Sequence, residues 1–119
     1  EFRVLAPLED LESTNENSLV YKLCCKEFSM LFCGDIEEKA ERLLLDIYGD
    51  ALRADVLKVP HHGSASATSD ALLEAVQPQY AVISSGEDRN LLPRNETLKR
   101  LLNFPHGRKR RYCDFDGRR

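Results

Sequence analysis

Strand-like apolar runs alternate with helical patterns along most of this 119-residue chain. Runs that predict strands occur at residues 28–33, 55–59 and 80–84, and an amphipathic helical pattern follows each of them. Such alternation is typical of parallel strands joined by right-handed helical crossovers. A strand at 18–24 and the polar link Lys26-Glu27 predict a hairpin with the strand at 28–33. The predicted fold is therefore α/β, with a mixed sheet in which a hairpin is followed by the order β-α-β-α-β-α.

The helical patterns carry their own boundary signals. Asp35 is the expected N-cap of the first helix and Gly49 its expected stop, whereas Ser69 is the expected cap of the second. The third helix is expected over residues 94–103. The apolar spacing predicts an inward face for each helix. These faces are Ile36, Ala40, Leu43, Leu44 and Ile47; then Leu72, Leu73 and Val76; then Leu98, Leu101 and Leu102. Residues 2–5 and 111–115 are the remaining candidate strands.

Two adjacent histidines, His61 and His62, follow the apolar run at 55–59 and precede Gly63-Ser64. Parallel neighbours place their carboxyl ends at one edge of a sheet, where ligands bind in open α/β folds. Asp35, both histidines and the loop at 84–90 should therefore gather there. Imidazole and carboxylate groups suit zinc or manganese, so a partial metal site is one interpretation. A helix-capping role for Asp35 and a turn-stabilising role for the histidines remain the alternatives.

Composition narrows the class of protein. The apolar fraction of 42% and the charged fraction of 31% are typical of one globular domain. No apolar run approaches the roughly 18 residues that a membrane-spanning helix needs. The four cysteines show no C-x-x-C spacing, which argues against a zinc ribbon or a thioredoxin motif. A reducing, cytoplasmic setting is therefore the expected one.

Charge is distributed unevenly along the chain. The net charge is −3, but residues 106–119 carry a charge of +4, so the remainder carries −7. A basic cluster of this kind binds phosphates in some proteins, which makes DNA a candidate partner. The alternative is a solvated edge strand whose charges prevent aggregation. Only Tyr112 and Phe115 interleave these charges, which favours the second interpretation.

Four motifs occur in order along the chain. They are Asn17-Ser18-Leu19-Val20, Leu31-Phe32-Cys33-Gly34-Asp35-Ile36-Glu37, Ala54-Asp55-Val56-Leu57-Lys58-Val59-Pro60-His61-His62-Gly63-Ser64 and Pro78-Gln79-Tyr80-Ala81-Val82-Ile83-Ser84. Through this set, over most of residues 15–117, the chain resembles the metallo-β-lactamase-fold domain at the C-terminal end of ComEC-type DNA-uptake (competence) proteins. The resemblance implies a four-layer αββα fold and a metal-dependent phosphodiesterase that degrades one DNA strand beside a membrane channel.

The resemblance also implies roles for single residues. Asp35 matches the family's metal-bridging carboxylate, and His61 and His62 match its histidine pair. One of these histidines is expected to bind metal (Zn or Mn) or to protonate the leaving oxygen, and the other to orient the loop. Ser64 and Ser66 are expected to donate hydrogen bonds to a phosphate.

The chain also departs from the family pattern. The family's H-x-H-x-D-H ligand motif has no counterpart here, Cys33 stands where Thr is usual, and Leu92 replaces a histidine. The expectation is that residues 1–119 form only the C-terminal half of such a domain and are inactive alone.

A half domain leaves part of its sheet uncovered, and Leu19, Tyr21, Leu31 and Val82 are the expected exposed residues. The chain is thus expected to pair with the missing N-terminal half or with another copy of itself. Two other interpretations remain: a degenerate, non-catalytic module of the same fold that binds nucleic acid or a protein partner, and a plain structural α/β domain.

Overall fold

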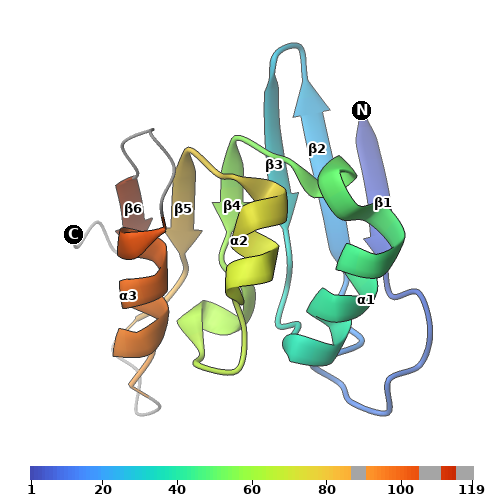
Figure 1. Ribbon diagram of the computed structural model, residues 1–119. Coiled ribbons are helices and arrows are strands. Elements are labelled where there is room, and N and C mark those ends of the chain that lie inside the picture. Colours follow the sequence, from blue (N-terminus) through green and yellow to red (C-terminus); the bar gives the residue numbers. More distant parts are fainter. Residues whose placement is uncertain (87–90, 105–110, 115–119) are drawn as a thin grey trace.

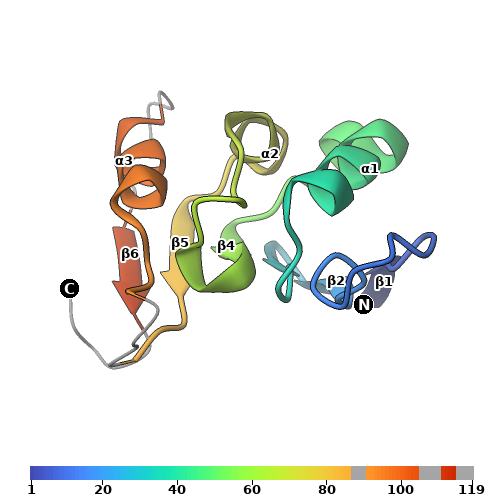
Figure 2. The ribbon, with the colours of Figure 1, turned by 90° about the horizontal axis from the view of Figure 1, so that it is seen from below.

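The computed structural model describes residues 1–86, 91–104 and 111–114. Six strands form one mixed sheet in the order β1-β2-β3-β4-β5-β6, and three helices lie along one face of it (Figures 1 and 2). The predicted fold class is confirmed. The elements are β1 Phe2–Ala6, β2 Val20–Cys25, β3 Phe28–Phe32, α1 Glu38–Tyr48, β4 Val56–Lys58, α2 Asp70–Val76, β5 Tyr80–Ile83, α3 Asn95–Asn103 and β6 Arg111–Asp114, with short 3-10 segments at Gly49–Leu52 and Pro60–Gly63.

Only β2 runs opposite to the other strands of the described sheet. β2 pairs antiparallel with β1 and β3, while β3, β4, β5 and β6 run parallel. Lys26 turns the predicted β2–β3 hairpin with a left-handed φ of 55°. The carboxyl ends of β3, β4 and β5 consequently meet at one edge, the lower edge in Figure 1. The basic residues predicted as a tail lie largely outside the described residues, apart from the backbone of β6.

The core lies between the sheet and the helices. Leu31 of β3, Leu57 of β4 and Ile83 of β5 are fully buried and contact the inward residues of the helices. Leu72, Leu73 and Val76 of α2 are buried as predicted, and the Ser69 hydroxyl caps this helix by accepting from Leu72 N at 3.1 Å. The expectation that Leu31 would be uncovered is wrong, because its side chain is on the helical face of β3.

Asp35 does not cap α1, contrary to the prediction. The N-cap position is Glu37, whose side chain makes no capping hydrogen bond. The buried carboxylate of Glu16 serves instead, because it accepts from the backbone N–H groups of Glu37 and Ala40. Asp35 lies two residues too early in the chain, and its carboxylate faces His62.

Two residues expected to face inward are exposed. Ile47 of α1 is 54% exposed and Leu102 of α3 is 66% exposed. The inward stripe of α1 contains Ala40, Leu44 and Tyr48, whose hydroxyl donates to Leu5 O at 2.9 Å. Ile47 lies beside this stripe, because each residue turns a helix by about 100°. No helix in the described part of the chain is long and apolar enough to span a membrane.

None of the described helices covers the opposite face of the sheet (Figure 2). Residues that pair directly across strands share a face, so Val4, Tyr21, Phe32 and Val82 all lie on this one. The Phe2 ring is tilted by 37° against Tyr21, with 4.8 Å between ring centroids, and Tyr21 stacks on Phe32 at 4.5 Å. Phe2 is 58% exposed and Val4 is 54% exposed. We call this surface the open face.

The predicted exposure of three residues is confirmed. Leu19, which directly precedes β2, is 49% exposed, and Tyr21 and Val82 are only half-buried. A contiguous apolar surface of this kind marks an interaction site on a folded chain.

Candidate functional site

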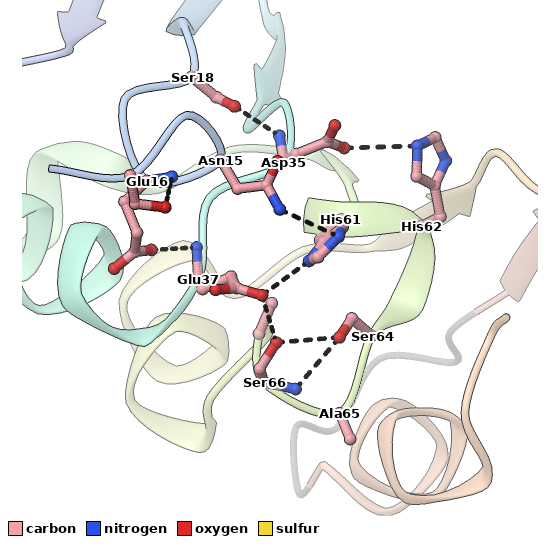
Figure 3. Close-up of polar contacts among 12 residues, drawn as sticks. Asn15, Glu16, Ser18, Asp35, Glu37, His61, His62, Ser64, Ala65 and Ser66 are labelled. Atoms are coloured by element: carbon pink, nitrogen blue, oxygen red, sulfur yellow. Dashed lines mark hydrogen bonds and ion pairs between the residues drawn. The ribbon is translucent and has the colours of Figure 1, made fainter. Parts of the chain in front are cut away.

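Polar side chains gather at the carboxyl edge of the parallel strands, as predicted. Asp35 follows β3, His61 and His62 follow β4, and Ser84 follows β5. Residues that are separated by almost 50 positions in the sequence are therefore neighbours (Figure 3). The predicted loop at 84–90 contributes Ser84 to this edge, while residues 87–90 lie outside the described residues.

His62 faces Asp35. Its Nε2 lies 3.3 Å from Asp35 Oδ1, and its Nδ1 lies 2.6 Å from the carbonyl oxygen of Ser84. A carbonyl oxygen only accepts, so Nδ1 carries the proton and donates it. In the neutral ring Nε2 therefore presents a lone pair to Asp35. Two electron-pair donors that face each other need a proton or a cation between them.

The spacing of these two atoms suits a metal ion. Two ligands that each lie about 2.1 Å from a tetrahedral metal are roughly 3.4 Å apart. Both side chains are 44% exposed, so an ion has access to them. Metal-binding histidines generally donate their other ring N–H to a carboxylate or a carbonyl oxygen, as His62 Nδ1 does to Ser84 O.

The backbone around Asp35 is fixed on both sides. Gly34 has a φ of +55°, and a Cβ on it would lie 2.8 Å from Ser18 Cβ, so only glycine fits. The Ser18 hydroxyl accepts from Asp35 N at 3.1 Å, and Gly34 O accepts from His61 N at 2.9 Å. These bonds tie the Asp35 turn to the histidine turn.

His61 turns away from Asp35. Its Nδ1 lies 3.0 Å from Glu37 Oε1 but makes no hydrogen bond within the described part of the chain. Its Nε2 lies 3.5 Å from the Asn15 amide nitrogen, and its side chain is 23% exposed. His61 thus bridges the loop before β2 and the start of α1, a position that suits loop orientation (Figure 3).

Ser64 and Ser66 lie on the His61 side of the site. The Ser66 hydroxyl donates to Glu37 Oε1 at 2.8 Å, and the two serine hydroxyls lie 2.9 Å apart. Glu37 is therefore shared between His61 and Ser66. The phosphate-binding role of both serines stays a prediction.

Two ionisable groups border the site. Burial raises the pKa of the Cys33 thiol, with smaller effects from Glu41 and Lys58, so it remains protonated and is a poor metal ligand. Burial also lowers the pKa of Lys58, and the nearby Cys33 and Asp35 oppose this shift. Lys58 pairs with Phe32 and Val82, which places it on the open face.

Sequence reasoning missed the residues that hold the site together: Asn15, Glu16 and Glu37. Asn15 and Glu16 belong to a polar stretch that reads only as loop, and no local signal marks a carboxylate that reaches a helix N-terminus 21 positions later. Glu37 was expected in the first turn of α1 only as a charge that complements the helix dipole.

The comparison with protein families decides the identity of the fold. A family model described as "Metallo-beta-lactamase superfamily" matches residues 7–87. The chain belongs to the metallo-beta-lactamase superfamily. This superfamily generally binds divalent metals. Among the residues that the structure describes, no group of three or more His, Cys, Asp or Glu side chains is placed to hold an ion. Within its described residues, this metallo-beta-lactamase chain presents the Asp35–His62 pair at the sheet edge but no group of three such side chains.

Curated relatives are competence and recombination proteins. "ComE operon protein 3" of Bacillus subtilis is 33% identical over 86% of this chain. "Competence protein ComA" of Neisseria gonorrhoeae is 38% identical over 72% of it, and "Recombination protein 2" of Haemophilus influenzae is 38% identical over 71%. The matches span only 13%, 13% and 10% of these proteins. The resemblance to competence proteins is thereby confirmed for this metallo-beta-lactamase segment.

Proposed function

We propose that residues 1–119 are the C-terminal half of a metal-dependent phosphodiesterase domain that hydrolyses DNA when complete. The observation that carries this proposal is the Asp35–His62 pair, in which a carboxylate oxygen and an imidazole lone pair face each other at 3.3 Å. The similarity to competence proteins supports DNA as the substrate. By the same similarity, the parent protein is membrane-associated.

Each site residue has a separate role in this proposal. Asp35 and His62 Nε2 hold a divalent ion, Zn or Mn, while Ser84 O keeps the Nδ1 proton in place. His61, held between Glu37 and Asn15, orients the loop. A bound metal supplies Lewis-acid activation of a phosphoryl oxygen and of water. Ser64 and Ser66 lie on the side from which a phosphate group would be hydrogen-bonded.

The remaining ligands come from outside this chain. The resemblance assigns them to an H-x-H-x-D-H motif in an N-terminal half, and two donors alone bind a metal weakly. Leu92 stands where the family has a further histidine, which removes one more ligand or proton carrier. The chain alone is therefore inactive in this proposal.

The open face is the surface that receives the N-terminal half. Apart from Lys58, the side chains named on this face are apolar, and Phe2, Tyr21 and Phe32 form an aromatic cluster on it. The relatives are many times longer than this chain, so sequence that supplies a second sheet is available in proteins of this kind. Burial of this face against another sheet would stabilise both by the hydrophobic effect.

Metal binding tests the site directly. In calorimetric titration with Mn²⁺ and Zn²⁺, Asp35→Ala and His62→Ala are each expected to weaken binding at least about tenfold, because each removes one donor. His61→Gln is the matched control, since His61 faces Glu37 and not Asp35. It should change the affinity by less than about threefold. Equal losses for all three variants would contradict the assignment of His62 as the ligand.

Complementation tests the complete domain. Mixing the chain with an N-terminal half that carries the H-x-H-x-D-H motif should yield Mn- or Zn-dependent DNA cleavage. Leu23 lies two residues after Tyr21 on β2 and therefore shares its side of the sheet. The double variant Val4→Lys, Leu23→Lys thus places charges on the open face and should abolish both assembly, measured by sedimentation, and cleavage. Ile47→Lys on the exposed side of α1 should leave both unchanged. A strictly monomeric, well-folded mixture without cleavage would count against the proposal.

The degenerate-module alternative has one observation in its favour. No group of three or more His, Cys, Asp or Glu side chains is placed to hold a metal ion in the described part of the chain. If neither the chain nor the complemented mixture binds metal, the remaining function is binding of nucleic acid or a protein partner, and the open face and residues 106–119 become the surfaces to test.

A further inference from the structure

The histidine turn adopts an unfavourable backbone conformation. His61 has a φ of 49° and His62 a φ of 53°, so two consecutive residues with a Cβ lie in the left-handed region. Single non-glycine residues visit this region occasionally, and consecutive ones cost free energy at each position. Such a conformation persists only where surrounding contacts over-determine it. Contacts with other parts of the fold must therefore hold residues 61 and 62 in this conformation.

The strand-side contacts hold the two histidines themselves, and Ser64 N closes the turn by donating to His61 O at 2.9 Å. His61 N donates to Gly34 O at 2.9 Å, and His62 Nδ1 donates to Ser84 O. Neither contact fixes the chain after His62. The conformation of His62 thus depends on how residues 63–69 are anchored.

Helix α3 anchors the first part of this segment. Arg94 N, at the start of the helix, donates to Gly63 O at 3.0 Å, and the Thr97 hydroxyl donates to Ser64 O at 3.0 Å. Thr97 is fully buried, so water cannot replace the hydrogen bond between its hydroxyl and Ser64 O.

Arg100, one turn later on α3, anchors the next part. Its Nη2 donates to Ala65 O at 3.2 Å and to Ala67 O at 3.0 Å. The same atom also donates to Thr97 Oγ1 at 3.1 Å, which couples the two side chains. One guanidinium and one hydroxyl thus donate hydrogen bonds to three backbone carbonyl oxygens of the loop, those of Ser64, Ala65 and Ala67.

Helix α1 closes the segment from the other side. The buried Glu41 carboxylate accepts from Thr68 N and from Ser69 N at 2.9 Å. The segment after His62 is therefore held by α3 at its beginning and by α1 at its end, immediately before Ser69 caps α2.

We infer that Thr97 and Arg100 are positioning residues that hold His62 Nε2 toward Asp35. They touch neither Asp35 nor His62. They fix the backbone carbonyls that follow His62 and thereby keep the histidine turn left-handed. The consequence for metal affinity rests on the proposed function, whereas the orientation of His62 does not.

The test uses the 119-residue chain in five forms: wild type, Thr97→Val, Thr97→Ser, Arg100→Met and Lys99→Met. Valine keeps the shape of threonine without its hydroxyl, serine restores the hydroxyl, and methionine keeps the stem of arginine. Lys99 is exposed on the same helix and is the matched control. Long-range ¹H–¹⁵N spectra at about pH 8 report which imidazole nitrogen carries the proton, with His62→Gln to assign the signals.

In Thr97→Val and Arg100→Met, the His62 signals should no longer show a proton on Nδ1 alone. In Thr97→Ser and Lys99→Met, these signals should be the same as in wild type. Zn²⁺ titration of the same proteins should show about a tenfold weaker affinity for the first two variants only. Wild-type imidazole signals in both Thr97→Val and Arg100→Met would overturn the inference. If the two variants lose the wild-type His62 signals but the wild-type protein does not bind Zn²⁺, the positioning role is supported and the proposed metal site is contradicted. Thermal unfolding of every form shows which variants are folded, and Arg100→Met decides if Thr97→Val does not fold.

Discussion

Alanine in place of Glu41 should lower the free energy of unfolding by about 3 kcal/mol, because it leaves the buried Thr68 N–H and the part-buried Ser69 N–H without an acceptor. The Glu41 side chain is 1% exposed and binds Thr68 N and Ser69 N. A domain of this size has a total stability of about 5–15 kcal/mol, so the loss would be a large part of it. Urea unfolding followed by circular dichroism measures the change.

Glu38→Ala is the control for this prediction. Glu38 lies on the same helix, is exposed, and forms an i,i+4 ion pair with Arg42. Its loss should cost less than about 0.5 kcal/mol. If both substitutions had the same effect, the Glu41 carboxylate would not be what fixes the start of α2.

The same residue predicts a pH dependence. Burial raises the pKa of Glu41 above its ordinary value, although the Ser69 and Thr68 hydrogen bonds and the charge of Arg100 oppose this. A raised pKa means that the folded state binds the proton more tightly than the unfolded state. The contribution of Glu41 to stability therefore falls as pH rises from about 4.5 through the folded pKa. Unfolding of Glu41→Ala should lack this component of the pH profile.

Alanine in place of Gly63 should destabilise the protein by about 3 kcal/mol and displace the histidine turn. Gly63 has a φ of +82°, and a Cβ on it would lie 2.5 Å from Pro93 Cβ and 3.1 Å from Pro93 Cα. A proline ring and its backbone have little freedom to move away. The clash thus adds to the cost of the left-handed conformation.

Gly49→Ala separates these two costs. Gly49 also has a positive φ, +49°, but a Cβ on it would meet nothing within 4 Å. Its substitution should cost only about 1 kcal/mol from backbone strain. Thermal and urea unfolding of both variants provide the comparison. An equal loss of stability at the two positions would show that Pro93 moves away from the added Cβ without a measurable cost.

Periodicity was sufficient to predict the order and type of the elements. The parallel arrangement followed from alternation, because helical crossovers leave few other topologies. Periodicity wrongly predicted that Ile47 and Leu102 would be buried, because a sequence pattern does not show how much of each helix the sheet covers. The half-domain argument failed for Leu31, because both faces of β3 carry apolar residues and the sequence does not show which face the helices cover.

The site was predictable as a location but not as a geometry. Topology alone brings Asp35 and the histidine pair to one sheet edge. The division of roles between His61 and His62 depends on two left-handed residues and on one backbone carbonyl, which leave no trace in composition or spacing. Carboxylates that bind a distant helix N-terminus, such as Glu16 and Glu41, are likewise invisible before the chain is folded.

The proton on His62 Nδ1 is held by the main chain of Ser84 and not by a side chain. Every amino acid at position 84 offers the same carbonyl oxygen, so random substitution there leaves the imidazole tautomer unchanged. A side-chain partner, such as a carboxylate, would be lost through a single codon change. The orientation of the imidazole therefore depends on the backbone at the end of β5, and the side chain at position 84 can change without removing this hydrogen bond.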